Sequence, residues 1–246
     1  MLNTRSIQLY LLMTFWINGG LFTPNNASGQ PCFDNEYSIY KLADTNLMIP
    51  NDTNFFSAFW QCAPVFSESH IVTHGYAQGV HSGVYIKKDN EFTNLADRTT
   101  AVPGFSSPLI SAYDPTTFGD TIYLQGQAEF PERGILKWEN DTLSLLIDSN
   151  CPVINSTNDI LFYSHPWGNE TNVAFVGGGE NGNGIYLYST NGITEIAVQG
   201  KPIPNDTNTF LYFNDLILNM DTLAFTHIRS NWYFRNELFT LRSNVL

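Results

Sequence analysis

The segment 227–236 carries the side chains best suited to holding a ligand. Its two arginines, Arg229 and Arg235, stand beside two aromatic residues, Trp232 and Tyr233. Aromatic rings beside guanidinium groups stack on sugar rings and anchor protein partners. We therefore take Arg229, Trp232, Tyr233 and Arg235 as candidate ligand-binding residues for an extracellular glycan or protein. The simpler alternative is that Trp232 and Tyr233 pack against a neighbouring part of the fold.

Aspartate recurs at one position of the sequence. Asp44, Asp97 and Asp148 are separated by 53 and 51 residues, and Val198 occupies the next equivalent position. A ring of carboxylates could bind Ca²⁺ through its oxygen atoms. An aspartate at a strand end also closes a turn by accepting a hydrogen bond from the backbone two residues further on. We favour the turn, because valine interrupts the ring, and we assign no metal site.

Two further patterns are weaker. His70 and His74 lie on or beside a predicted strand, where a four-residue spacing separates Cα atoms by about 13 Å. Together with His81 we interpret them as ordinary surface or core histidines. The stretch 177–182 matches G-x-G-x-x-G, but a strand is predicted after it, whereas a dinucleotide site needs a helix there. It is therefore a glycine-rich hairpin loop, and the sequence contains no catalytic motif that would assign an active site.

The elements that must position these residues form a repeat. Ile49–Phe56 and Ile203–Phe210 are identical at seven of eight positions and lie 154 residues apart. A second segment, of the type Gly-Ile-Tyr-Leu, recurs at spacings of 51, 50 and 53 residues. Such internal periodicity indicates a repeat architecture, here of four units. The recurring segments begin at Gly83, Gly134, Gly184 and Glu237.

Each unit contains four short runs rich in β-branched and aromatic residues, bounded by Gly, Asn, Asp and Pro. Such runs favour strands, and four strands per unit are typical of a propeller blade. We therefore predict an all-β fold in which residues 30–246 form a single four-bladed β-propeller. Tyr37–Asp44 lacks a preceding strand and Leu238–Leu241 lacks a following one, so we expect these two to pair and close the ring. A straight stack of sheets, or a fragment of a longer array, is the alternative.

The repeat also resembles a known type. The pattern is Ala43–Asn46, then Ile-Pro at 49–50 with Phe55, then Val173–Phe175, then Gly184–Tyr186. It is similar to a tandem repeat of secreted, functionally uncharacterised bacterial proteins. The resemblance covers nearly all of the chain after residue 29, although Asn-Asp stands where Gly-Gly usually follows the proline. It implies a secreted, β-propeller-like protein and carries no catalytic residue.

The N-terminus has the pattern of an export signal. Arg5 precedes an apolar stretch, Ile7–Ile17, which is too short to span a bilayer, and small residues at 27–29 offer a cleavage site. We therefore predict that residues 1–29 are a signal peptide, that no later segment spans a membrane and that the protein is secreted. A buried first strand or an uncleaved anchor is the alternative.

Export makes disulfides and glycans possible. Cys32, Cys62 and Cys151 allow one disulfide and one leftover thiol, and the sequence leaves the pairing open. Asparagine sequons are glycosylation candidates wherever they survive signal cleavage. They lie at Asn51, Asn140, Asn155, Asn169 and Asn205, with a sixth at Asn26 inside the predicted signal.

Composition narrows the function. The 246 residues include 11 Lys and Arg against 23 Asp and Glu, a net charge of −12, which argues against a nucleic-acid binder. Aromatic residues make up 14% of the chain, enough to build a core and to argue against disorder. We expect a secreted, non-enzymatic binding module without a cofactor. The alternatives are a secreted hydrolase or lyase acting on a polysaccharide, and a structural glycoprotein of an extracellular matrix or coat.

Overall fold

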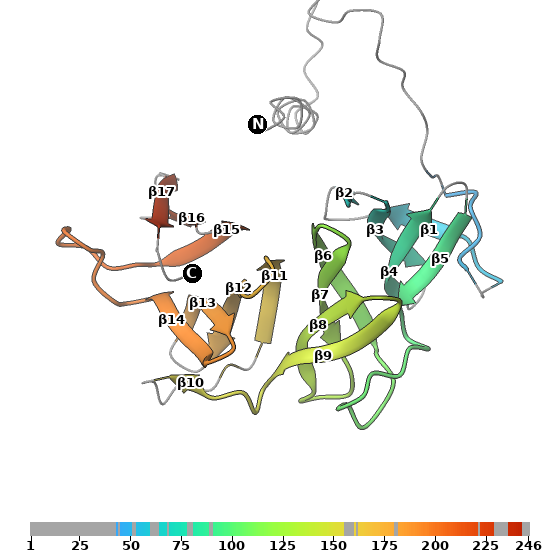
Figure 1. Cartoon of the computed structure of the whole chain (residues 1–246), viewed down its shortest axis with the longest axis horizontal. Coiled ribbons are helices and arrows are strands. Elements are labelled where there is room, and N and C mark those ends of the chain that lie inside the picture. Colours follow the sequence, from blue (N-terminus) through green and yellow to red (C-terminus); the bar gives the residue numbers. More distant parts are fainter. Residues whose placement is uncertain are drawn as a thin grey trace, which may run out of the picture. The chain divides into compact units, whose positions relative to one another are not determined.

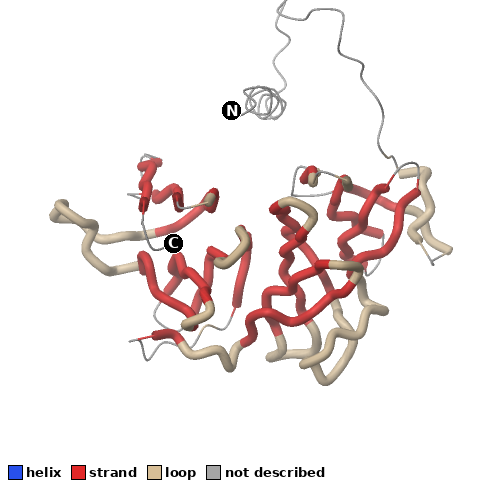
Figure 2. The backbone as a smooth tube through the Cα atoms, viewed as in Figure 1, coloured by secondary structure: helices blue, strands red, loops and turns tan. Residues whose placement is uncertain are grey.

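Every regular element that the structure describes is a β-strand (Figure 1). The computed structural model describes residues 43, 45–50, 53–59, 64–67, 69–77, 81–88, 91–154, 160, 162–179, 182–220, 222–228 and 236–242. Within these residues, strands are joined by loops and turns alone (Figure 2). The predicted all-β class is therefore confirmed. The predicted signal peptide, residues 1–29, lies outside the described part of the chain.

The strands follow one another in four groups, which we call units 1 to 4. Unit 1 contains β1 (Phe56–Phe59), β2 (Val65–Phe66), β3 (Ile71–Ala77), β4 (His81–Lys88) and β5 (Glu91–Ala96). Unit 2 contains β6 (Ser111–Phe118), β7 (Thr121–Gln127), β8 (Arg133–Glu139) and β9 (Thr142–Asp148). Unit 3 contains β10 (Val153–Ile154), β11 (Phe162–Gly168), β12 (Val173–Gly179), β13 (Gly182–Ser189) and β14 (Gly192–Val198). Unit 4 contains β15 (Tyr212–Asn219), β16 (Thr222–Ile228) and β17 (Asn236–Arg242).

Strands that follow one another within a unit pair antiparallel. Units 2 and 3 each form a four-stranded meander, β6 to β9 and β11 to β14, and β10 adds a parallel edge to β14. In unit 1 the order is β2-β3-β4-β5, with β1 also pairing with β3. A parallel bridge between Ser82 and Ser111 joins units 1 and 2 into one nine-stranded sheet. Three of the four units thus show the predicted succession of four strands.

Unit 4 has three strands in the described residues, β15-β16-β17. Its predicted fourth strand is the segment Tyr37–Asp44, of which only Ala43 belongs to the described part of the chain. The structure therefore describes several sheets, and the closure of the units into a ring falls outside the described residues.

Glycines mark the same register in successive units. Gly75 pairs with Gly83 across β3 and β4, and Gly126 pairs with Gly134 across β7 and β8. A Cβ at Gly134 would collide with the carbonyl oxygen of Ile147 on the next strand. The repeated glycine of unit 2 is therefore required by the close approach of its neighbouring strand, whereas unit 4 has Glu237 at the equivalent position.

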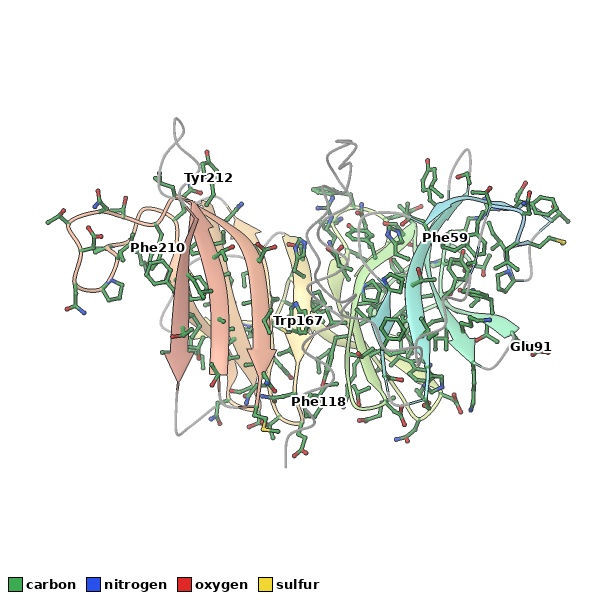
Figure 3. All side chains as sticks on the ribbon, turned by 90° about the horizontal axis from the view of Figure 1, so that it is seen from above. Phe59, Glu91, Phe118, Trp167, Phe210 and Tyr212 are labelled. Atoms are coloured by element: carbon green, nitrogen blue, oxygen red, sulfur yellow. The ribbon has the colours of Figure 1, made fainter. Side chains whose placement is uncertain are left out.

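The hydrophobic core is divided among consecutive units. One buried cluster joins Val72 and Val84 of unit 1 to Leu124 and Leu136 of unit 2. The next cluster joins unit 2 to unit 3, and a third joins unit 3 to unit 4. Phe118 packs against the second cluster and Trp167 against the third (Figure 3). Each sheet thus buries its faces against its neighbours in the chain, as repeat proteins do.

The two copies of the eight-residue motif form the same loop. The amide of Ile49 donates to the carbonyl of Asn54 at 2.9 Å, and the amide of Ile203 donates to the carbonyl of Asn208 at 2.9 Å. The isoleucine is buried in both copies. So is the last phenylalanine, which is Phe56 in one copy and Phe210 in the other. Figure 3 labels Phe210.

Candidate functional site

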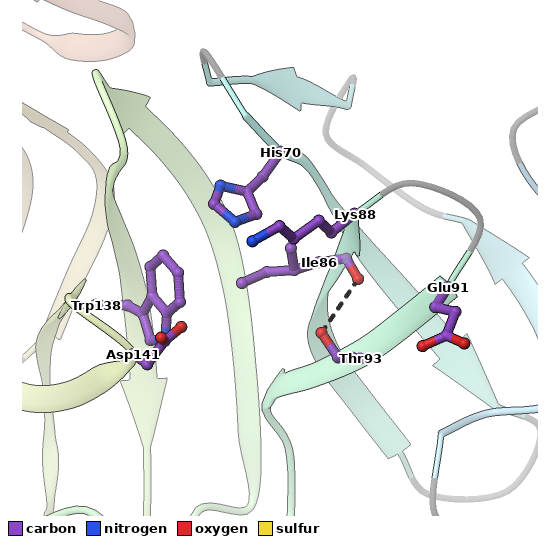
Figure 4. Close-up of a pocket in the computed structure, with 7 residues that line it drawn as sticks. All are labelled: His70, Ile86, Lys88, Glu91, Thr93, Trp138 and Asp141. Carbon is purple, nitrogen blue, oxygen red and sulfur yellow. Dashed lines mark hydrogen bonds between the residues drawn. The ribbon is translucent and has the colours of Figure 1, made fainter.

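The four residues that the sequence favours for ligand binding, Arg229, Trp232, Tyr233 and Arg235, lie outside the described residues. The described part of the chain offers a different site, a pocket with a cavity volume of about 480 Å³ between units 1 and 2. It is lined by His70, Ile86, Lys88, Glu91, Thr93, Trp138 and Asp141 (Figure 4).

One side of the pocket is the hairpin of β4 and β5. Ile86 is paired with Thr93 and Lys88 with Glu91, so the four residues alternate along the two strands and share one face. Ile86 is buried, and the Thr93 hydroxyl donates to its carbonyl oxygen at 3.5 Å. The lysine extends toward His70 and Trp138 (Figure 4). This side of the pocket therefore contributes the apolar Ile86 together with the charged Lys88 and Glu91.

The opposite side comes from the end of β8 and the turn after it. Trp138 is the penultimate residue of β8 and packs against the core cluster of units 1 and 2. Asn140 and Asp141 form the two-residue turn to β9 with φ of 51° and 57°. Asparagine and aspartate tolerate this left-handed conformation better than other non-glycine residues. The turn places the Asp141 carboxylate beside the indole (Figure 4).

His70 forms the third part of the lining. Its ring meets the Trp138 indole edge to face, with centroids 5.6 Å apart and an interplanar angle of 86°. Nδ1 lies 2.7 Å from the Ser69 hydroxyl and 3.7 Å from the Asp120 carboxylate. The Ser69 hydroxyl also donates to Asp120 at 2.7 Å. These contacts on Nδ1 fix the orientation of the imidazole beside the indole.

Asp120, which contacts Ser69 and His70, has a lowered pKa. The hydrogen bond from Ser69 lowers the pKa of Asp120, and the neighbouring Ser67 and His70 contribute in the same direction. Asp120 therefore remains a carboxylate at neutral pH and continues to accept the serine hydroxyl.

The lining groups suit a polyhydroxylated ring. Trp138 offers an aromatic face, Lys88 donates hydrogen bonds, and Glu91, Asp141 and the Thr93 hydroxyl oxygen accept them. Pockets that bind sugars and similar small molecules combine an apolar surface with a few polar groups that set the orientation. The arrangement can thus hold a sugar without any catalytic group being assigned.

The recurring aspartates close turns. Oδ1 of Asp97 accepts the amide of Thr99 at 2.8 Å, and Oδ1 of Asp148 accepts the amide of Asn150 at 2.9 Å. The turn interpretation is confirmed at these two positions, while Asp44 lies outside the described residues. Across the described ranges no group of three or more His, Cys, Asp or Glu could hold a metal ion.

Valine serves at the equivalent position of unit 3 because the backbone supplies the same turn there. The amide of Lys201 donates to the carbonyl of Val198 at 3.1 Å, and the amide of Thr100 donates to that of Asp97 at 2.9 Å. The carboxylate reinforces a turn that the main chain already makes.

The structure describes the side chains of His70 and His74, while that of His81 lies outside the described part. His74 is buried, as a core histidine should be, with Nε2 2.5 Å from the Ser82 hydroxyl. His70 is a pocket residue, which the sequence pattern did not indicate. Gly179 pairs with Gly182 at the end of the β12–β13 hairpin, which confirms the predicted hairpin loop. No local signal could have found the pocket, because its residues come from two units.

The sequons differ in their surroundings. Asn140 and Asn205 are exposed, both with positive φ. Asn169 is buried, and its Nδ2 donates to the carbonyl of Met220 at 2.7 Å. Asn51 and Asn155 lie outside the described residues.

Cys151 is a free thiol in the structure. Its Sγ lies 3.5 Å from Oδ1 of Asp148, and burial raises its pKa. A disulfide that includes Cys151 is therefore not supported. Cys32 and Cys62 lie outside the described residues.

No protein-family model matches the chain, and no curated protein matches it either. The described residues include no helix with the length and apolarity needed to cross a membrane.

Proposed function

We propose that the chain is a secreted binding module that holds an extracellular glycan in the pocket of units 1 and 2. The observation that carries the proposal is the Trp138 indole, held edge to face by His70 at 5.6 Å and facing the polar side chains of β4 and β5. An indole in a pocket provides a flat apolar surface, and a sugar ring presents a flat C–H face to match it.

The polar groups favour a sugar over a purely apolar ligand. Glu91, Asp141 and the Thr93 hydroxyl oxygen accept hydrogen bonds from hydroxyls, while Lys88 donates to ring and hydroxyl oxygens. Acceptors on two sides of the pocket and a lysine donor on one side fit a ring with hydroxyls around its rim.

We further propose that the four units close into a four-bladed β-propeller, completed by pairing of residues 37–44 with β17. Two observations support this. The strand order within units 1 to 3 is that of a propeller blade. Consecutive units also share their buried clusters face to face. The resemblance to secreted bacterial repeat proteins is consistent with the same architecture.

A glycan array with the full-length chain tests the binding function. Trp138→Ala should weaken binding of the preferred glycan about tenfold, or about 1.4 kcal/mol, because the stacking surface is lost. Phe130→Ala is the matched control, since Phe130 is an aromatic residue 85% exposed on the β7–β8 loop. Trp232→Ala tests the ligand-binding residues predicted from the sequence.

An unchanged profile for Trp138→Ala, or no glycan bound by the wild type, would contradict the pocket. Loss of binding in Trp232→Ala alone would move the site to the segment 227–236. Cleavage of the bound glycan would instead support the alternative of a polysaccharide-degrading enzyme. Recovery of the protein as an insoluble assembly would support the alternative of a structural matrix or coat glycoprotein.

A further inference from the structure

Buried polar atoms without a partner are rare in folded proteins, and each one calls for an explanation. Four such side-chain atoms occur in the described part of the chain. Two of them, on Gln125 and Arg133, belong to neighbouring strands of unit 2 and surround the same tyrosine, Tyr113. The four atoms are Asn94 Oδ1, Gln125 Oε1, Arg133 Nε and Glu195 Oε2.

The sheet register brings these residues to one face. Tyr113 on β6 is the cross-strand partner of Gln125 on β7. Arg133 on β8 is the cross-strand partner of Gln127, two residues along β7. Because side chains alternate along a strand, residues 125 and 127 and their partners point to the same side. The Gln125 amide donates to the Tyr113 hydroxyl at 3.0 Å, and that hydroxyl donates to Oε1 of Gln127 at 3.3 Å.

Gln125 is 3% exposed, yet its amide has a single hydrogen-bond partner. Whichever end of the amide faces Tyr113, the other end is buried and unpartnered. A buried amide in this state costs folding free energy that a bound group would recover. Oε1 of Gln125 is thus a buried hydrogen-bond acceptor without a partner.

Arg133 is unused in the same way. The described ion pairs join His70 to Asp120, Lys137 to Glu139, His165 to Asp114 and Lys201 to Glu195. Arg133 takes part in none of them, although acidic residues outnumber basic ones by 23 to 11 in the chain. A half-buried guanidinium normally has a carboxylate or carbonyl partner.

The charge of Arg133 acts at the tyrosine. Burial raises the pKa of Tyr113, and the positive charge of Arg133 opposes that rise more than any other group does. The acidic neighbour, Asp114, acts in the opposite direction and is itself 3.9 Å from His165. The guanidinium and the phenol therefore share one polar environment.

We propose that Arg133, Gln125 and Tyr113 form a binding site for a carboxylate with a hydroxyl group nearby. The carboxylate accepts hydrogen bonds from the Nε edge of the guanidinium, which matches its geometry. The ligand hydroxyl donates to Oε1 of Gln125, and Tyr113 holds the amide in place. A uronic-acid unit of a glycan and a free hydroxy acid both carry this pair of groups.

The site is separate from the glycan pocket. Ile135, which shares a side of β8 with Arg133, packs in the cluster of units 2 and 3. Trp138 packs against the cluster of units 1 and 2. The two sites therefore lie on opposite faces of the unit 2 sheet, and one can fail without the other.

Isothermal titration calorimetry of the full-length chain tests the proposal with three probes. Glucuronate carries the carboxylate and hydroxyls, glucose replaces the carboxylate by a hydroxymethyl group, and lactate is a free hydroxy acid. We expect saturable binding of glucuronate and at least tenfold weaker binding of glucose. Lactate that binds as tightly as glucuronate identifies a free acid as the source, and weaker lactate binding identifies a sugar unit.

Arg133→Gln should weaken glucuronate binding at least tenfold, while Arg98→Gln, at an exposed arginine, should leave it unchanged. Arg133→Lys is the second variant, to be used if Arg133→Gln does not fold. It keeps the positive charge but loses the two-donor edge of the guanidinium, so it should bind glucuronate several-fold more weakly than the wild type. Trp138→Ala should retain glucuronate binding at this site. Equal binding of glucose and glucuronate, absence of saturable binding, or wild-type affinity in the Arg133 variants would overturn the proposal.

Discussion

The imidazole Nδ1 of His165 lies 3.9 Å from Oδ2 of Asp114, and the two residues occupy equivalent positions of successive units. Asp114 on β6 has φ of 52° and His165 on β11 has φ of 49°. Each precedes a proline, and the strand register shifts at each. The same bulge therefore recurs in units 2 and 3 and brings an acid and an imidazole together.

The bulge makes Asp114 sensitive to substitution. Asp114→Val should lower the free energy of unfolding by about 1–2 kcal/mol, because a β-branched residue is disfavoured at positive φ. Asp114→Asn should cost less, since asparagine adopts this conformation readily. Urea unfolding followed by tryptophan fluorescence measures both. Equal losses in the two variants would show that the backbone conformation is not the cause.

Asn169 links three units through one side chain and its carbonyl. Its Oδ1 accepts the amides of Thr171 and Asn172, its Nδ2 donates to Met220, and its carbonyl accepts the Tyr123 hydroxyl at 2.9 Å. Asn169→Ala removes these three side-chain hydrogen bonds and a fourth, longer one donated by the Thr171 hydroxyl, and it should destabilise the fold by about 2–3 kcal/mol. Chemical unfolding measures the loss.

Asn191→Ala is the control for that variant, because Asn191 is exposed in the β13–β14 turn. It should change the unfolding free energy by less than about 0.5 kcal/mol. Similar unfolding free energies for the two variants would show that the Asn169 side chain does not stabilise the contact between units.

Together with the proposed export of the chain, the surroundings of the sequons predict which of them carry glycans. Asn140 and Asn205 are exposed and should be occupied. Asn169 should be unmodified, because the nitrogen to which a glycan is attached donates to Met220 instead. Glycopeptide mass spectrometry of the folded, secreted chain measures the occupancy. A glycan on Asn169 in folded protein would contradict the hydrogen-bonded arrangement.

Two tyrosines predict a loss of stability in alkali. Burial raises the pKa of Tyr123 and of Tyr186 to about 12, and Glu139 and Glu195 respectively add to the rise. In the unfolded chain a tyrosine ionises near pH 10. Between about pH 10 and 12 the folded state therefore binds more protons, so the free energy of unfolding falls as the pH rises.

Denaturation at a series of alkaline pH values measures this slope. Tyr186→Phe should make the fall of the unfolding free energy with pH shallower. The described hydrogen bonds include none from the Tyr186 hydroxyl, so the variant removes only the ionisable group. A slope that is unchanged in the variant, or stability that is flat across this range, would contradict the assignment.

The proposed ring closure predicts a difference between two proline variants. Ile39→Pro should lower stability, because proline removes a hydrogen bond from a strand paired with β17. Asn35→Pro, before the strand, should have little effect. Thermal unfolding and size-exclusion chromatography measure stability and association. Equal behaviour of the two variants would argue for an open array.

The strands and turns of this structure could be predicted from the sequence, because they depend on local interactions. The aspartates at 97 and 148 and the twin IPNDTN loops act through their own backbone or through residues a few positions away, and the glycines at 83 and 134 act through the strand that follows in the chain. Their spacing therefore predicted the all-β class, the unit length and the turns. The sequence pattern did not predict how one unit packs on another, nor that Cys151 is a free thiol.

The sequence by itself determined where strands and turns form, since backbone conformation and nearest neighbours decide those. Only the tertiary structure decided that His70 and Trp138, 68 residues apart, line one pocket. It also decided that the Asn169 sequon is buried and that Arg133 lies beside Tyr113 without a carboxylate. These outcomes depend on which faces of successive sheets meet, and burial between sheets is a sum over many distant residues.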